Sequence, residues 1–79
     1  MPLNFHEIRA RISTAAAAGL ADSFALLREV SGYLNVTKGT SDEHLGQALV
    51  IRLLDVRHIF DDHAAILDSL RRESGLFPY

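Results

Sequence analysis

The stretch TSDEHLGQALVIRLLDV, residues 40–56, decides the fold class of this chain. Thr40 and Glu43 have the spacing of a capping box, and Asp42 with Glu43 places negative charge at the positive end of a helix dipole. Apolar side chains then recur around much of the helix circumference: Leu45, Ala48, Leu49, Val50, Ile51, Leu53, Leu54 and Val56. This pattern predicts a helix over residues 42–59 that lies at the centre of a helical bundle.

Two amphipathic segments with helical period precede this stretch. The first predicts a helix over residues 5–18, which Asn4 can cap and Gly19 can end. The second predicts a helix over residues 23–34, which begins after Asp22. The apolar stripe of the second helix should consist of Phe24, Leu27, Val30 and Leu34, with Leu26 and Tyr33 at its edges.

The C-terminal part of the chain predicts a fourth helix over residues 62–74, which Asp61 or Asp62 can cap and Gly75 can end. Residues 36–40 lack a helical stripe and should form an exposed loop. The chain should therefore adopt an all-α fold, a compact bundle of four to six short antiparallel helices in one domain over residues 1–79. Two glycines inside the predicted helices should mark close helix crossings, Gly32 and Gly46. The most buried side chains should include Leu27, Leu49, Leu53, Leu67 and Leu70.

Composition excludes several classes of protein. The chain has no cysteine, so it contains no disulfide and no thiolate zinc site, which fits a reducing, cytoplasmic compartment. No apolar run approaches the roughly 18 residues of a membrane span. The formal net charge is −2 and lysine occurs once, whereas a protein that binds nucleic acid concentrates lysine and arginine against the phosphates. We expect no nucleic acid and no membrane among the partners.

The candidates for catalysis are weak. The serines lack the strand-turn-helix setting of a nucleophile, and the five glycines are too dispersed to form a phosphate loop. Asp55, His58 and Asp62, with His63 nearby, could be drawn as a metal site, but the expected helix break near Asp61 separates them. We therefore expect a protein that is not an enzyme and that needs no cofactor or metal.

The charged side chains have two interpretations. Glu7 with Arg11, and Asp68 with Arg71 or Arg72, have the spacing of solvated pairs within one helix. Alternatively, opposed patches could mediate head-to-tail assembly, because residues 1–40 carry a net charge of +1 and residues 41–79 carry −3. The candidate partner-binding residues are then Arg9, Arg11 and Arg28 on the basic side, and Asp42, Glu43, Asp61 and Asp62 on the acidic side.

Three segments carry a family resemblance: residues 24–30 (FALLREV), the long apolar stretch 45–60, and residues 65–77 (AILDSLRRESGLF). In length, helix spacing and leucine pattern the chain resembles the small helical recruitment modules of the death-fold group. In particular it is similar to bacterial death-like or caspase-recruitment-like domains associated with proteases in antiphage defence. Members usually have six helices. The resemblance implies homotypic association and recruitment of an effector, often a peptidase.

Two functions from different classes follow as hypotheses. The first is a protein interaction module that assembles with itself or recruits a protease-type effector. The second is a helical accessory or N-terminal regulatory piece of a larger defence enzyme, such as a nuclease, helicase or protease. A third hypothesis, a small metal or ligand binder, rests on Asp55, His58 and Asp62.

Overall fold

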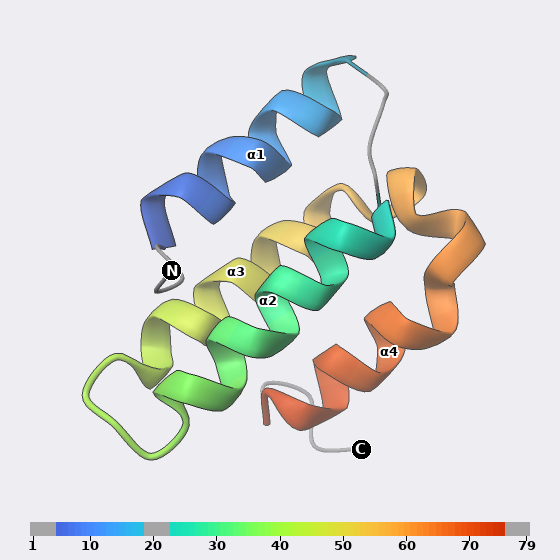
Figure 1. The fold of residues 1–79 in the computed structure, drawn as a ribbon. Helices are drawn as coiled ribbons and strands as arrows, with labels where there is room; N and C mark the ends of the chain where they lie inside the picture. The colour runs from blue at the N-terminus through green and yellow to red at the C-terminus, as the bar shows by residue number, and fades with distance from the viewer. Residues whose placement is uncertain (1–4, 19–22, 76–79) are drawn as a thin grey trace.

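A computed structural model describes residues 5–18 and 23–75 of the chain. These residues form four α-helices and one 3₁₀-helix: α1 (Phe5–Ala18), α2 (Ser23–Thr37), α3 (Glu43–Asp55), η1 (Arg57–His63) and α4 (Ala64–Glu73). No strand occurs within the two described ranges, so the predicted all-α fold is confirmed. Figure 1 shows α1, α2 and α3 side by side, with η1 turning the chain so that α4 can pack beside α2.

The core lies where α1, α2, α3 and α4 converge, and η1 contributes to it from one end. The five leucines expected to be most buried are at most 5% exposed, which confirms this prediction. The buried hydrophobic residues are Ile8, Ile12 and Ala15 of α1, Leu26, Leu27, Val30, Tyr33 and Leu34 of α2, Leu49, Val50 and Leu53 of α3, and Val56, Phe60, Leu67 and Leu70 beyond it.

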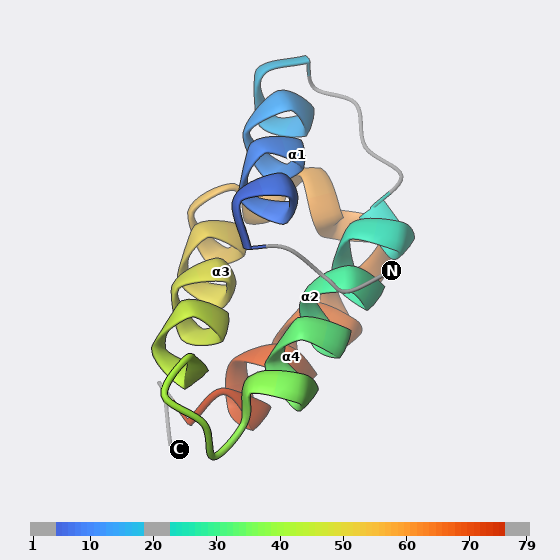
Figure 2. The ribbon, with the colours of Figure 1, turned by 60° about the vertical axis from the view of Figure 1, so that its left-hand side comes forward.

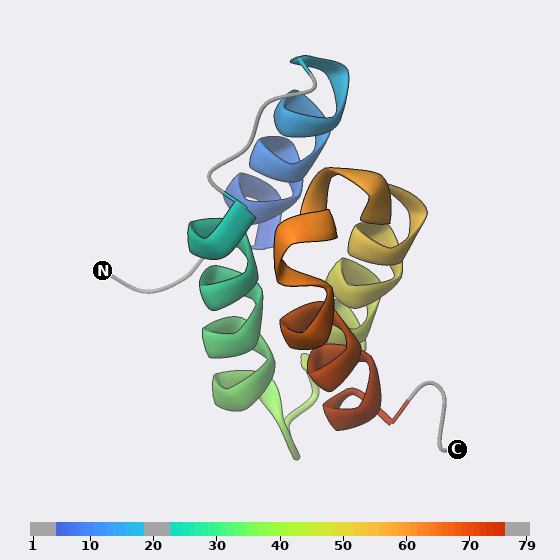
Figure 3. The same ribbon diagram turned by 90° about the vertical axis from the view of Figure 1, so that its right-hand side faces the viewer.

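The central helix is α2, not α3 as the sequence predicted. α2 contacts α1, α3, η1 and α4, and α3 contacts α1, α2 and α4. Both helices keep a face towards solvent, where Val36 of α2 is 67% exposed and Ile51 of α3 is 46% exposed. α2 and α3 pack against each other, and Figures 2 and 3 show the loop that joins them at one end of the bundle. The apolar pattern of α3 is wider than its buried face, because a helix at the edge of a bundle keeps some apolar surface exposed.

α2 is longer than predicted and ends at Thr37 instead of Leu34. The hydroxyl of Thr37 donates to the carbonyl oxygen of Tyr33 at 2.8 Å, so this polar side chain is buried with its hydrogen bond made. Thr37 is therefore not part of an exposed loop, although Val36 beside it is 67% exposed. A threonine whose hydroxyl donates to a carbonyl of the preceding turn can continue a helix. The β-branched residues Val36 and Thr37 do not indicate this hydrogen bond in the sequence, so the helix was predicted to end earlier.

Gly46 marks the close crossing of α2 and α3, as predicted. A Cβ atom at this position would lie 3.1 Å from Leu34 Cδ1, 3.1 Å from Thr37 Oγ1 and 3.4 Å from Leu34 Cα. The two 3.1 Å distances are shorter than ordinary van der Waals contacts, so the glycine lets the two helices approach closely.

Replacement of Gly46 by valine should lower the free energy of unfolding by about 1 to 3 kcal/mol, because the added methyl groups overpack the crossing. The better helix propensity of valine returns only a few tenths of a kcal/mol. Urea unfolding followed by circular dichroism measures the difference. Ala48→Val, on the exposed face of the same helix, is the matched control and should change stability little. Equal losses in the two variants would contradict the tight crossing.

The start of α3 differs from the predicted capping box. The hydroxyl of Thr40 accepts a hydrogen bond from the Asp42 amide at 3.1 Å, and the carboxylate of Glu43 accepts from the Gly39 amide at 3.2 Å. The Thr40 amide is already bonded to the carbonyl of Thr37 at 2.9 Å, so Glu43 has to reach one residue further back. The side chains of Thr40 and Glu43 thus accept hydrogen bonds from backbone amides, as in a capping box. These amides belong to the turn before α3, however, so the two residues do not form the reciprocal cap that the sequence predicted.

The predicted helix over 42–59 is too long, since α3 ends at Asp55 and η1 follows. Phe60 has non-helical backbone angles, φ −115° and ψ 21°, and its side chain is fully buried. The buried phenyl ring stabilises a bend that local periodicity does not specify. α4 consequently begins at Ala64, and its N-cap is His63 without a side-chain hydrogen bond, so neither Asp61 nor Asp62 caps it as predicted.

The end of α4 follows the prediction, since Gly75 has a left-handed backbone with φ +75°. The amide of Ser74 donates to the Leu70 carbonyl at 2.9 Å, and Gln47 Nε2 of α3 donates to the Ser74 carbonyl at 3.0 Å. The C-terminal end of α4 is therefore tied to α3. The predicted caps and stops at Asn4, Gly19 and Asp22 lie outside the described residues.

Candidate functional site

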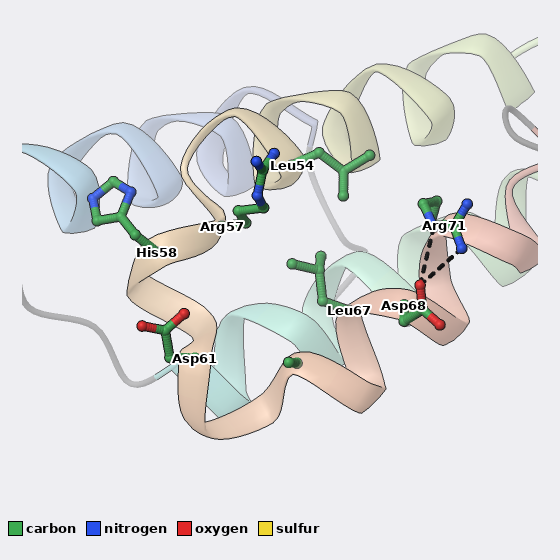
Figure 4. A pocket seen from close by; sticks show the side chains of 8 residues that line it. Leu54, Arg57, His58, Asp61, Leu67, Asp68 and Arg71 are labelled. Carbon is green, nitrogen blue, oxygen red and sulfur yellow. Dashed lines mark hydrogen bonds and ion pairs between the residues drawn. The ribbon is translucent and has the colours of Figure 1, made fainter.

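A hollow of about 460 Å³ lies where the end of α3, η1 and α4 meet. Its floor is apolar and its rim is charged or polar, and Figure 4 shows the side chains that surround it. The lining residues are Leu54, Ala64 and Leu67 on the apolar side, and Arg57, His58, Asp61, Asp68 and Arg71 on the rim. The bend at η1 creates this hollow, because it carries α4 away from the direction of α3.

One wall of the hollow is a three-residue ion-pair cluster within α4. Arg71 Nε and Nη2 donate to Asp68 Oδ1 at 3.0 and 2.9 Å, and Arg72 Nη1 donates to Asp68 Oδ2. These are the intrahelical pairs that the sequence predicted. The hydrogen bond from Arg71 lowers the pKa of Asp68 below its ordinary value, with further contributions from the positive charges of both arginines. The side chain of Asp68 is 45% exposed, so solvent screens this cluster.

The opposite wall carries two charges without a hydrogen bond or ion pair among the described residues, Arg57 and Asp61. They are four residues apart, which is the spacing of a pair in an α-helix. In η1 the 3₁₀ geometry and the bend at Phe60 direct the two side chains apart. Figure 4 shows Arg57 beside Leu54, with Asp61 on the part of the chain that leads to α4.

The structure separates the basic residues proposed as a partner site. Arg11 forms an ion pair with Glu29, which joins α1 to α2, whereas the sequence predicted that Arg11 pairs with Glu7. The second oxygen of Glu29, Oε2, is buried without a hydrogen-bond partner among the described residues. Arg28 lies 5.7 Å above the centroid of the Phe24 ring. Arg9 is exposed on α1.

Phe24 does not belong to the apolar stripe of α2, contrary to the prediction. Its side chain is 45% exposed and its ring lies 5.6 Å from the ring of His63, between η1 and α2. Arg28 lies over the ring of Phe24 and therefore at the η1 end of the bundle. Asp61 and Asp62 lie at this same end, so the basic candidate Arg28 and these acidic candidates are not on opposed faces of the domain.

The four acidic candidates do not form a single corner. Asp42 and Glu43 lie at the first turn of α3, and Asp61 and Asp62 lie beyond its other end. The 13 residues of α3 separate the two pairs by about 20 Å. Figures 1 and 2 show the loop before α3 at the end of the bundle remote from η1. The sequence analysis did not identify Arg57 and Leu54 as residues of the candidate site, and no local signal marks them, because the bend at Phe60 that places them beside the hollow depends on tertiary packing.

The residues considered as a metal site do not form one. Within residues 5–18 and 23–75, no group of three or more His, Cys, Asp or Glu side chains lies close enough to hold a metal ion. His58 lines the hollow, and His63 packs against Phe24. The absence of metal binding stays a prediction. None of the described helices is long and apolar enough to cross a membrane.

Tyr33 gives the fold a defined response to alkaline pH. Burial raises the pKa of its hydroxyl above the ordinary value of 10.0, and the negative charge of Asp42 raises it further. The neutral tyrosine therefore stabilises the fold below pH 10, and this contribution is lost as the pH rises towards the folded pKa. We expect the free energy of unfolding of the parent to fall more steeply above about pH 10 than that of Tyr33→Phe. Parallel curves in urea titrations at several pH values would contradict the raised pKa.

Comparison with known proteins assigns the chain to a family. The family model of the anti-bacteriophage protein B N-terminal domain matches residues 1–79, and the chain belongs to this family. A relative from Escherichia coli (strain K12), anti-bacteriophage protein B, is 51% identical over 35 residues. The aligned segment covers 44% of this chain and 5% of that relative, so the relative is a far longer protein.

No solved structure matches the chain. The described residues contain four α-helices and one 3₁₀-helix, whereas death-fold members usually have six helices. The small all-α domain is thus established, and the resemblance to death-fold recruitment modules stays a hypothesis.

Proposed function

We propose that this chain is the N-terminal accessory domain of a larger antiphage-defence protein and that it acts by contacting another protein surface. The observation that carries the proposal is the family match over residues 1–79 to an N-terminal domain of an anti-bacteriophage protein. The small share of the Escherichia coli relative that aligns with the chain supports a domain attached to a much longer polypeptide. If the longer protein is a nuclease, helicase or protease, its reaction takes place in the part of the polypeptide outside this domain.

The described surface supports a role in protein contact. The hollow combines an apolar floor with a rim that includes the exposed side chains of Arg57, His58 and Asp61. A small apolar centre with a polar rim is the usual composition of a protein interface. The chain's net charge of −2 disfavours a nucleic-acid backbone as the partner.

A second candidate function is homotypic assembly or recruitment of a protease-type effector in the bacterial cytoplasm, as the death-fold resemblance implies. The observation that favours it is the pair of opposite charges, Arg57 and Asp61, that lack a partner within the described part of the chain. Such a module would be non-catalytic and would need no cofactor.

The whole protein that contains this domain is the right material for the test. Bacteria that carry it should be challenged with phage, and the parent compared with a variant that lacks residues 1–79 and with the full-length double variant Arg57→Ala, Asp61→Ala. We expect loss of protection in both variants at unchanged protein abundance, measured by plaque counts and immunoblot. The double variant Lys38→Ala, Glu73→Ala also removes one positive and one negative charge, at exposed positions that do not line the hollow. It is the control and should protect like the parent. Full protection without residues 1–79 would overturn the proposal.

A further inference from the structure

The charged side chains around the hollow carry a net positive charge, although the chain as a whole is acidic. With Arg72 included through its ion pair to Asp68, the rim holds three arginines and two aspartates: Arg57, Arg71, Arg72, Asp61 and Asp68. The whole chain has eight basic and ten acidic side chains, which leaves five basic and eight acidic ones elsewhere. The rim therefore has a formal charge of +1, whereas the rest of the chain has −3.

Positive charge lies on both walls of the hollow. In α4, Arg71 donates to Oδ1 of Asp68 and Arg72 donates to Oδ2, so two arginines share one carboxylate and the cluster keeps one positive charge. The side chain of Arg72 is 57% exposed, which places this charge in reach of a partner. On the other wall, Arg57 lies beside Leu54 and forms no ion pair within the described residues (Figure 4).

The shape of the hollow suits a side chain that another polypeptide presents. Its volume of about 460 Å³ lies within the range of ligand sites, but such sites bury most of a small molecule. Of the eight lining residues, only Leu67 is buried and four are exposed, so this hollow cannot enclose a small ligand. Its apolar floor also offers nothing to an inorganic anion, whereas it can cover one large apolar side chain.

We propose that the hollow binds an acidic segment of a partner protein, with one large apolar side chain on the floor and carboxylates beside Arg57 and Arg72. This inference rests on the proposed function, contact with another protein, and adds the chemistry of the partner. The apolar centre supplies affinity, and the charges at the rim select the partner. Asp61 has no ion pair within the described ranges, so it opposes an acidic segment.

The probe is a library of random short peptides, selected by mRNA display on the immobilised 79-residue chain at low salt. We expect the enriched peptides to combine several Asp or Glu residues with Leu, Ile or Phe. Fluorescence anisotropy with the synthesised peptides then gives the Kd, which added salt should raise because exposed charge pairs are screened. Failure to enrich any peptide, or enrichment of basic peptides, would overturn the inference.

Charge variants test the rim. The double variant Arg57→Ala, Arg72→Ala should raise the Kd of the enriched peptides by about tenfold, because it removes a cation from each wall. Asp61→Asn should lower the Kd by about two- to fivefold, since it removes the opposing charge. The control Arg9→Ala, Lys38→Ala loses the same charge at exposed positions outside the hollow and should bind nearly as the parent does. Equal losses in the two double variants would contradict binding at this rim.

A substitution that fills the hollow tests the apolar floor. Ala64 is exposed and lines the hollow, so Ala64→Phe should block it and raise the Kd by about tenfold or more. Ala65→Phe, at an exposed neighbour that does not line the hollow, is the matched control and should bind as the parent does. Circular dichroism should show equal helicity in all variants. Binding that survives Ala64→Phe would reduce the contact to surface charge and overturn the inference.

Two further outcomes separate this inference from its alternatives. Self-association of the parent that is lost in Ala64→Phe, measured by sedimentation, would assign the hollow to a second copy of the chain and overturn the inference. Loss of phage protection without residues 1–79, combined with no enriched acidic peptide, would reject the inference while the proposed function stands. The peptide selection uses the purified chain, so its failure is distinct from failure of the phage challenge.

Discussion

Replacement of Phe60 by alanine should lower the free energy of unfolding by about 3 to 5 kcal/mol, because it empties a fully buried aromatic site. Phe60 fills the space beneath η1 and stabilises the non-helical backbone at the bend. A chain of this length is stable by only about 4 to 12 kcal/mol, so the variant should be partly unfolded near physiological temperature. Thermal and urea unfolding, followed by circular dichroism, measure the loss.

Phe24→Ala is the matched control for this variant. It removes the same side chain from a position that is 45% exposed, where the ring contacts only His63 and Arg28 among the ring and cation contacts described. Its cost should stay within about 1 kcal/mol, the order of an exposed cation–π contact. If both variants lost similar stability, the phenyl ring of Phe60 would not be the support of the bend.

Replacement of Leu53 by alanine should lower the free energy of unfolding by about 2 to 5 kcal/mol. Leu53 is fully buried on the inner face of α3, so truncation leaves a cavity that neighbouring helices can only partly fill. The urea midpoint should fall while the slope of the transition stays constant, as expected for a loss of packing without a change in the surface exposed on unfolding.

Val36→Ala gives the contrast for Leu53. Its side chain is 67% exposed near the end of α2, so its truncation should change stability by no more than about 0.5 kcal/mol. A shift at position 36 as large as the shift at position 53 would show that the core is not organised as described.

The sequence predicts the helical elements well where one local signal dominates. α1 has the predicted range because its apolar period is regular, and α4 stops just before Gly75, where glycine readily adopts the left-handed backbone. The core leucines follow from the same periodicity. These features depend on residues within one or two turns of each other, which a single sequence contains.

The bend after Asp55 could not be placed from local pattern. Val56, Ile59 and Phe60 continue an apolar sequence that fits a longer α3, and the burial of Phe60 against distant segments decides the outcome. The residues of the candidate site could not be predicted for the same reason, because the bend places them. The spacing of Arg57 and Asp61 predicts a pair in an α-helix, and only the 3₁₀ backbone shows that they diverge. Likewise, the distance between Asp42 and Asp61 depends on the length and direction of α3.

The position of α2 has a consequence for how the domain comes apart. Because α2 contacts each of the other four elements, none of them can detach without uncovering part of the apolar stripe on α2. Partial opening therefore carries much of the cost of complete unfolding, which favours a cooperative, two-state transition. Within a longer polypeptide, the domain should respond to mechanical or proteolytic stress as a single unit that is either intact or lost.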